Sequence, residues 1–232
     1  MRNFSLFFLI VFSTTFHQVA GQISISYPTT RAVFQRNNSN QTSIYIAGNY
    51  TSMVDRVEAR AITRPMTPSQ GVSLNWTTIQ TNPSNGYFYG TLNLTGGWYD
   101  IEVKCWLGSV LVGTASVQRI GVGEVFLIAG QSNATGDSYL ASQGNYGPQA
   151  NDDRVSVVNY NLSNITNYGS CNLPAAEFSH LDSTLNIAPF GTSAWCWGAL
   201  GDTLVKRLNV PIAFFTRAFH RKRMDEGLIV EQ

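Results

Sequence analysis

The chain has 232 residues, and 44% of them are hydrophobic, which is enough to bury a core and excludes an intrinsically disordered chain. Charged residues make up only 12%, about half of the roughly 25% found in an average soluble protein. The formal net charge of +1 offers no long-range attraction for nucleic acid or for an acidic membrane surface, so neither partner is indicated.

Residues 1–21 have the pattern of a secretory signal peptide. Arg2 provides a positive charge, Leu6–Phe12 is an apolar run, and a small-residue cleavage site ends at Gly21. The apolar run is shorter than the ~20 residues that a membrane-spanning helix needs, and no later stretch approaches that length. We therefore expect a secreted or periplasmic protein whose mature chain begins at Gln22, with no membrane span.

Residues 22–120 show short segments with alternating apolar and polar residues, the period of half-buried β-strands. Asn85-Gly86 and Gly96-Gly97 supply turn residues between such segments. This spacing, without helical stretches, predicts a β-sandwich accessory domain. The predicted strands are Gln22–Tyr27, Ser43–Ala47, Val57–Ile62, Ser73–Gln80, Tyr87–Leu94, Trp98–Leu107 and Leu111–Gln118.

Several aromatic residues of this region allow two interpretations. They form a platform on which sugar rings stack, or they fill the core of the sandwich and its contact with the next domain. We favour the second interpretation, a place in the core or at the contact with the next domain, because nothing in the sequence gathers them on one face. The residues concerned are Tyr50, Trp76, Tyr87, Phe88 and Trp98.

Near Gly121 the pattern changes from alternating to continuously apolar, and we place a domain boundary there, with Gly121 and Gly123 as the joint. Val125–Ala129 reads as a strand buried on both faces of a parallel sheet. Gly130 then allows a sharp turn, which presents Ser132 at the edge where open α/β sheets bind ligands. Ser132 is thus a candidate nucleophile, although a strand followed by an ordinary polar turn gives the same pattern.

The block Val-Phe-Leu-Ile-Ala-Gly-Gln-Ser-Asn-Ala-Thr-Gly, residues 125–136, resembles the first motif of the SGNH hydrolases. It is most similar to the branch that contains sialate O-acetylesterases and acetylxylan esterases. The resemblance implies a three-layer α/β/α fold and a serine esterase that removes acetyl groups from carbohydrates, without a metal or other cofactor. Ser132 takes the position of the family's nucleophile, its backbone N–H that of an oxyanion donor, and the side chains of Gln131 and Asn133 shape the same pocket.

Beyond this block the sequence favours strand-helix-strand order. We predict a loop over 137–154, a strand over Val155–Tyr160, and a loop that contains Cys171 and Pro174. Apolar residues at helical spacing predict a helix over Ser193–Leu208, capped by Thr192 or Ser193 and ended by Asn209, before a strand over Pro211–Phe215. A helix with Trp, Gly and Leu and a Val-Pro-Ile strand stand in this order in the resembling family, so the likeness extends to Phe215.

The pattern fails after Thr216. The family continues with a small-residue turn, whereas residues 217–232 hold 7 charged residues among 16. The family's later Gly-Glu-rich and Asp-x-x-His blocks are absent. We therefore expect residues 121–216 to be the first half of a catalytic domain and 217–232 to be an anomalous charged tail, from a frame slip, an early stop or a gene-model error.

A catalytic serine needs a neighbouring base, and the mature chain offers only His180 and His220. His180 lies near Asp182 in an expected loop but outside an Asp-x-x-His arrangement, and His220 lies in the charged tail, where solvated side chains are expected. We expect neither to be the base. The chain as written should therefore be weakly active or inactive.

The three cysteines match no zinc pattern. In an oxidising compartment we favour a disulfide between Cys171 and Cys196 and read Cys105 as a buried, inert thiol. Eight Asn-x-Ser/Thr sequons, including those at Asn93 and Asn133, leave N-glycosylation open. The oligomeric state is open as well.

Taken with the resemblance, these features predict an exported carbohydrate O-acetylesterase, a sialate O-acetylesterase-like serine carboxylic-ester hydrolase whose substrate is an acetylated carbohydrate. The alternative is a secreted glycan-binding β-domain attached to a non-catalytic remnant. A third possibility is a product that folds poorly, because half a sheet leaves an unpaired edge.

Overall fold

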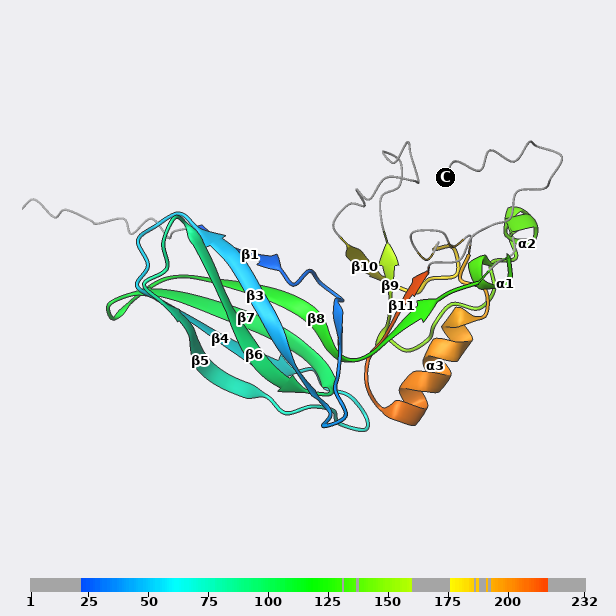
Figure 1. Ribbon diagram of the computed structural model, residues 1–232, viewed down its shortest axis with the longest axis horizontal. Helices are drawn as coiled ribbons and strands as arrows, with labels where there is room; N and C mark the ends of the chain where they lie inside the picture. The colour runs from blue at the N-terminus through cyan, green and yellow to red at the C-terminus, as the bar shows by residue number, and fades with distance from the viewer. Residues whose placement is uncertain are drawn as a thin grey trace, which may run out of the picture.

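The computed structural model describes residues 22–130, 132–136, 138–159, 176–185, 187, 191 and 193–216. In this part of the chain the structure consists mostly of β-sheet with few helices (Figure 1). Strands fill one end of the elongated molecule, and the helix α3 (Trp197–Leu208) covers the other.

One sheet has three antiparallel strands in the order β1-β3-β6. Its strands are β1 (Ile23–Tyr27), β3 (Gln41–Tyr50) and β6 (Tyr87–Thr95). Alternation decides which side chains point inward: Ile44 and Ile46 are fully buried, whereas Tyr45 between them is 45% exposed.

A second sheet has eight strands, with a main path in the order β10-β9-β11-β8-β7-β4-β5 and β2 paired to β8 beside it. β4, β5, β7 and the first part of β8 pair antiparallel. The bounds are β2 (Val33–Gln35), β4 (Arg56–Thr63), β5 (Leu74–Thr81), β7 (Gly97–Leu107), β8 (Val110–Ile128), β9 (Val155–Asn159), β10 (Glu177–His180) and β11 (Ile212–Thr216).

The two sheets share one hydrophobic core at the strand-rich end. Ile44 and Phe88 of the three-stranded sheet belong to the same buried cluster as Val57, Ile101 and Val103 of the larger sheet. Phe88 is 1% exposed, so the core interpretation is correct for this aromatic residue.

The other aromatic residues of this region differ in burial and in the cluster to which they belong. Trp98 is also fully buried, but it packs with Val33 and Ala213 in a separate cluster at the junction with β11. Tyr87 is 62% exposed, so the core interpretation is wrong for this residue.

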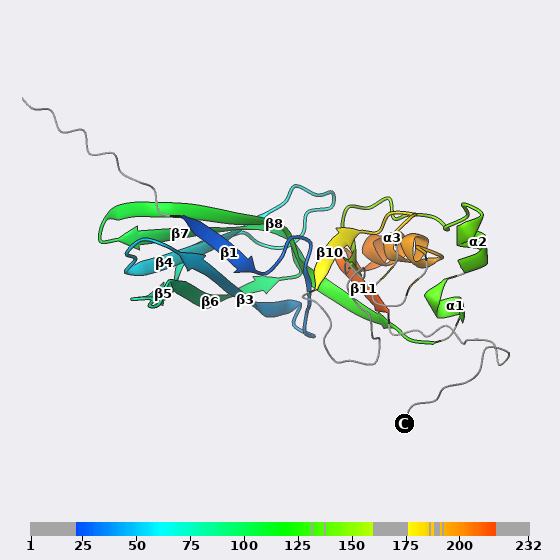
Figure 2. The ribbon, with the colours of Figure 1, turned by 90° about the horizontal axis from the view of Figure 1, so that it is seen from above.

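β8 runs without a break from the strand-rich end into the end that carries α3 (Figure 2). Its first part pairs with β7, Gly121–Gly123 pairs with β2, and Glu124–Ile128 pairs in parallel with β11. The expected joint at Gly121 and Gly123 is therefore the middle of a strand, and the domain division at this point stays a prediction.

The glycines of β8 are explained by close packing. A Cβ on Gly123 would lie 1.9 Å from the carbonyl oxygen of Pro211, and one on Gly121 would lie 2.9 Å from the Pro211 and Val33 side chains. The backbone of Glu124 donates a hydrogen bond to that same Pro211 oxygen. Glycine thus lets the chain before β11 approach β8.

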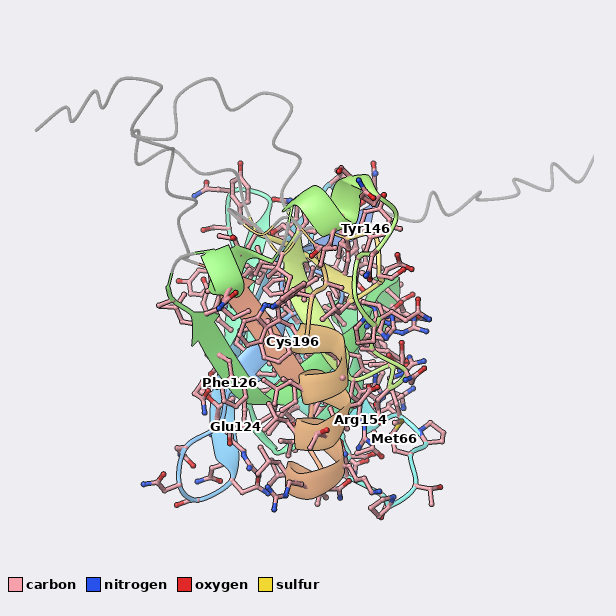
Figure 3. All side chains as sticks on the ribbon, turned by 90° about the vertical axis from the view of Figure 1, so that its right-hand side faces the viewer. Met66, Glu124, Phe126, Tyr146, Arg154 and Cys196 are labelled. Carbon is pink, nitrogen blue, oxygen red and sulfur yellow. The ribbon has the colours of Figure 1, made fainter. Side chains whose placement is uncertain are left out.

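At the end with α3, the strands β8, β11 and β9 are parallel and β10 is antiparallel to β9. α3 lies between β9 and β11 in sequence and covers one face of them: Phe214 is 5.8 Å from Phe126 and 6.0 Å from Trp197 between ring centroids. Figure 3 looks onto this helix, with Cys196 at its start. This arrangement is an α/β unit.

α3 begins four residues later than predicted from the sequence. Its N-cap is Cys196, without a side-chain hydrogen bond, so Ser193 is not the cap. Trp195 has a φ of 46°, which no right-handed helix allows, and this turn delays the start. The predicted end is confirmed: Asn209 adopts the left-handed conformation and its N–H bonds the carbonyl of Val205.

Two further sequence predictions are wrong. The strand end at Val125–Ile128 is not buried on both faces, because Leu127 is 66% exposed on the face opposite α3. Phe178–His180 is strand rather than loop, since it pairs with β9 in β10. β2, α1 (Ser132–Thr135) and α2 (Ser138–Ser142) were not predicted either.

The thiol of Cys105 is fully buried, as predicted, and this burial raises its pKa to about 11. It is therefore protonated and unreactive at neutral pH. Cys196 is exposed and its thiol is free, while the proposed disulfide partner Cys171 lies outside the described residues.

Replacing Gly123 by Ala should destabilise the protein by about 2–4 kcal/mol, because the added methyl group meets backbone rather than a side chain that can move. Urea unfolding followed by circular dichroism measures this. Gly108→Ala is the control: nothing lies within 4 Å of its Cβ, and only its φ of 59° costs about 1–2 kcal/mol. Equal losses in both variants would contradict the packing argument.

Candidate active site

The predicted nucleophile follows the end of a parallel strand. β8 ends at Ile128, Gly130 forms a turn, and α1 begins at Ser132. Gly130 has a φ of 151° and a Cβ there would lie 3.0 Å from that of Ala134, so this turn favours glycine. The backbone of Ser132 therefore lies at the carboxyl edge of the parallel strands, where α/β proteins bind ligands.

Of the other two predicted site residues, the structure describes only one. Asn133 is the second residue of α1 and is exposed, and Gln131 lies outside the described residues. Within α1, Thr135 is buried and its hydroxyl donates to the carbonyl oxygen of Gly136 at 3.2 Å, which anchors the turn after the serine. The catalytic and pocket roles of Ser132, Gln131 and Asn133 remain predictions.

The same edge receives the end of β11. Thr216 pairs with Ile128, so the chain leaves β11 level with the start of the Gly130 turn. Thr216 is only 2% exposed. Parallel strands end at one edge, so the end of β11 lies beside the turn that leads to Ser132.

His180 lies at the opposite edge. It pairs with Ser156 near the start of β9, and its Nε2–H donates to the carbonyl oxygen of Asp152 at 3.1 Å. β9 is parallel to β11 and β11 to β8, so the start of β9 and the end of β8 lie at different edges. The topology thus supports the expectation that His180 is not the base for Ser132. His220 lies outside the described residues.

The carboxylate near His180 is also held locally. Asp182 is exposed and accepts hydrogen bonds from the backbone N–H and the hydroxyl of Thr184, at 2.9 and 2.7 Å. These bonds lower the pKa of Asp182. Among the described residues, the recorded hydrogen bonds of Asp182 go to Thr184 and that of the His180 ring goes to Asp152, so no hydrogen bond joins the two side chains.

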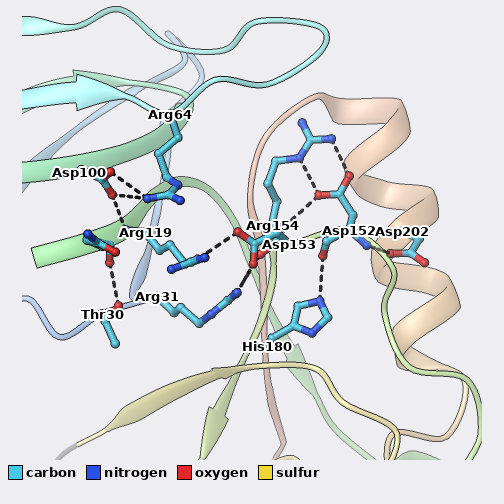
Figure 4. Close-up of polar contacts among 11 residues, drawn as sticks. Thr30, Arg31, Arg64, Asp100, Arg119, Asp152, Asp153, Arg154, His180 and Asp202 are labelled. Carbon is cyan, nitrogen blue, oxygen red and sulfur yellow. Dashed lines mark hydrogen bonds and ion pairs between the residues drawn. The ribbon is translucent and has the colours of Figure 1, made fainter.

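An ion-pair cluster at this edge joins the strand-rich end to the α/β end (Figure 4). Asp153 pairs with Arg31, and its other oxygen lies 3.0 Å from Nε of Arg119. The carbonyl of Asp153 also accepts from Arg31. Arg119 in turn donates its backbone N–H to Asp100, which pairs with Arg64 at 2.7 Å.

A second pair continues the cluster toward α3. Arg154, 5% exposed, donates to both oxygens of Asp152 at 2.8 and 2.7 Å and to the side chain of Asn209 at 3.2 Å. Gln70, from the loop between β4 and β5, donates to the same Asn209 oxygen at 2.8 Å. Asp202 of α3 accepts the backbone N–H groups of Asn151 and Asp152.

The electrostatics of the cluster stabilise the charged carboxylates. Burial alone raises the pKa of Asp153, but hydrogen bonds and charge from Arg119 and Arg31 outweigh it and leave the pKa below its ordinary value. The pKa of Asp152 is likewise raised by burial but lowered in total, chiefly by Arg154. The ion pairs of the cluster thus link the strand-rich end of the molecule to the end that carries α3.

A pocket of about 420 Å³ opens beside this cluster, lined among others by Arg154, Asp202 and Lys206. The pocket lies at the edge where the parallel strands begin, their amino edge, which is the edge of His180 and not that of Ser132. Among the described residues no group of three or more His, Cys, Asp or Glu side chains is placed to hold a metal ion. No helix within the described ranges is long and apolar enough to cross a membrane.

Comparison with known proteins finds no matching family model and no matching curated protein. Among solved structures, a carbohydrate acetylesterase from Xanthomonas citri is similar with a TM-score of 0.46 and 17% identity, over 83% of this chain and 39% of that one. A superoxide reductase (neelaredoxin) from Ignicoccus hospitalis gives a TM-score of 0.28 and 11% identity, over 43% and 78%. Both TM-scores are too low to assign a fold or an activity.

The sequence did not reveal the ion-pair cluster. Its members come from separate loops and strands, and single Arg and Asp residues in such places carry no pattern. The only signal was the local Asp152-Asp153-Arg154 sequence directly before a predicted strand. The serine turn, by contrast, was visible because the apolar strand, Gly130 and Ser132 are contiguous in the sequence.

Asp153→Asn should lower the melting temperature by about 2–4 °C at pH 6, because it weakens two partly exposed ion pairs. Folding lowers the pKa of the Asp153 carboxyl below 3.8, its ordinary value in the unfolded chain. The ionised carboxylate therefore stabilises the fold above that pH, and this contribution is lost as the pH falls through the pKa of the folded state. The gap between wild type and variant should therefore narrow as the pH falls below 3.8.

Melting curves from pH 2 to 7 measure this gap. Glu177→Gln, at an exposed carboxylate without an ion pair among the described residues, is the control and should melt like the wild type throughout. A gap for Asp153→Asn that persists unchanged at pH 2 would show that the ion pairs are not its cause.

Proposed function

We propose that this chain carries the nucleophile-bearing part of an exported carbohydrate O-acetylesterase, with Ser132 as the attacking residue. The observation that supports it best is the Gly130 turn, which begins α1 at Ser132 on the carboxyl edge of three parallel strands. The motif around this turn resembles that of SGNH esterases, and its local structure has the strand-turn-helix form that a nucleophile of this kind needs.

The proposed architecture is a β-sandwich over 22–120 followed over 121–216 by the first half of an SGNH-type α/β/α domain. Two sheets that share one core favour the first part. Parallel strands β9 and β11 joined through α3 favour the second. Only one face of β8 and β11 is covered by a helix among the described residues, and Leu127 is exposed on the other.

In the proposed reaction, Oγ of Ser132 attacks the acetyl carbonyl carbon and passes its proton to a base. The backbone N–H of Ser132 stabilises the oxyanion, and Gln131 and Asn133 shape the pocket. The sugar hydroxyl leaves with a proton from that base, and water then releases acetate from the acyl-serine. Since His180 is at the far edge, the base comes from outside the described residues.

The proposed substrate is an acetylated carbohydrate, with the sialate O-acetylesterase branch as the nearest resemblance. Residues 1–21, which lie outside the described part, would direct the protein to the outside of the cell or to the periplasm. The chain spans 39% of the length of the acetylesterase to which it is similar, so the activity of a whole enzyme is part of the proposal.

The test compares the protein expressed from its complete gene with its Ser132→Ala variant, by measuring acetate released from acetylated xylan and from O-acetylated sialic acid. We expect Ser132→Ala to lower the rate by about 10⁴-fold or more, because the nucleophile is lost. Ser116→Ala, at an exposed serine of the same strand β8, is the matched control and should act like the wild type.

His180→Ala tests the topology in the same assay. It should keep the esterase rate within about twofold, because His180 is bonded to Asp152 at the opposite edge. A loss as large as that of Ser132→Ala would make His180 the base and overturn the assignment of edges. Equal rates for wild type and Ser132→Ala would overturn the proposed nucleophile.

A further inference from the structure

Every exposed aromatic side chain of the described residues lies on one sheet. Tyr27, Tyr45, Tyr87 and Tyr89 are 43%, 45%, 62% and 56% exposed, and all belong to the three-stranded sheet. The other exposed large apolar side chains are aliphatic residues or Met53, and they come from other elements and loops. A chance scatter of exposed side chains does not concentrate one residue type on a single face.

Three of these tyrosines form a continuous row across the strands. Tyr45 of β3 is 6.3 Å from Tyr89 of β6 between ring centroids, and the two planes differ by only 22°. Tyr27 of β1 is 6.3 Å from Tyr45 on the other side, with planes 48° apart. We call Tyr27, Tyr45 and Tyr89 the tyrosine strip.

The strip is not required by the core. The inward neighbours on the same strands, such as Ile44, Ile46 and Phe88, already fill the space between the sheets. No described residue is a hydrogen-bond partner of the three phenol groups. Ring faces and hydroxyls are thus available together on the outer surface, a combination that binding surfaces use.

The face that carries the strip holds no charge. β1, β3 and β6 contain no Asp, Glu, Lys or Arg. The outer face of the other sheet is different: Trp76 there is covered by Arg60 at 4.6 Å and Lys104 at 4.1 Å, and Arg60 pairs with Glu102. A partner matched in charge to the strip is therefore neutral, which argues against nucleic acid and acidic polymers.

We propose that the tyrosine strip binds a neutral polysaccharide chain of pyranose rings. The C–H faces of such rings are apolar and flat and pack on aromatic rings, while their hydroxyls bond to phenol and amide groups at the edges. Exposed Asn93 of β6, two residues beyond the Thr91 that pairs with Tyr45, supplies an amide group on the same sheet. A chain that lies diagonally across β1, β3 and β6 places successive sugars on successive tyrosines.

This binding is independent of the esterase chemistry. The strip belongs to the three-stranded sheet and Ser132 to the far end of β8, so one can fail without the other. Ser132→Ala should bind polysaccharide like the wild type. If the tyrosine strip binds polysaccharide but Ser132→Ala has the same esterase rate as the wild type, the proposed nucleophile is wrong and the proposed binding surface is unaffected.

The test is native affinity electrophoresis of the full chain in gels that contain soluble xylan, mixed-linkage β-glucan or polygalacturonate. The protein is produced in a bacterial host, so that the Asn93 sequon stays unmodified. We expect retardation by at least one of the two neutral polymers and none by anionic polygalacturonate. Tyr45→Ala and Tyr89→Ala should each raise the dissociation constant about three- to tenfold.

Two variants separate stacking from general damage. Tyr45→Phe keeps the ring and should keep the dissociation constant within about twofold. Trp76→Ala removes a partly buried aromatic from the outer face of the other sheet and should bind like the wild type. Absence of retardation by both neutral polymers, or equal retardation of wild type and Tyr45→Ala, would overturn the proposal.

Sedimentation of the same proteins tests the competing occupant, a second copy of the chain. We expect wild type and Tyr45→Ala to have the same oligomeric state. A wild-type dimer that Tyr45→Ala converts to a monomer would overturn the proposal and make the strip an interface between copies.

Discussion

The structure depends on one uninterrupted strand. β8 pairs with the antiparallel strand β7 at one end and with the parallel strand β11 at the other. Both hydrophobic cores therefore contain residues of this strand. This is possible only because Gly121 and Gly123 let Pro211 and Trp98 approach its backbone. Sterics at two positions thus determine how β11, and with it α3, meets the strand-rich end.

Polar contacts at the amino edge then fix the orientation that β8 permits. Asp153 forms ion pairs with Arg31 and Arg119, both of which precede the parallel part of β8 in sequence. The guanidinium of Arg31 also lies 5.9 Å from the centre of the buried Trp98 ring. The ion pairs of Asp152 and Asp153 are therefore gathered at the amino edge of the parallel strands, away from the carboxyl edge at which Ser132 lies.

Local patterns in the sequence predicted more than long-range ones. Alternation located β3, β6 and β7, and Asn209 marked the end of α3, because these signals lie within a few residues. The start of α3 and the exposure of Leu127 depend on a turn at Trp195 and on what covers each face of the sheet, which no local pattern encodes. In the candidate site, Gly130 and Ser132 were predictable for the same reason, whereas the position of His180 follows only from strand pairing. The tyrosine strip had a signal that was missed: Tyr45 and Tyr89 occupy outward positions of alternating strands.

The continuity of β8 also bears on how such a molecule can evolve. Domains that are joined by a linker are exchanged between proteins by recombination at that linker. Here a cut between Ile120 and Gly121 would remove the partner of β2 and uncover Trp98, since Gly121–Gly123 pairs with Val33–Gln35 and Ala213 packs on the indole. Separation of the two ends at this position would therefore require a new partner for β2 and a new cover for the Trp98 indole.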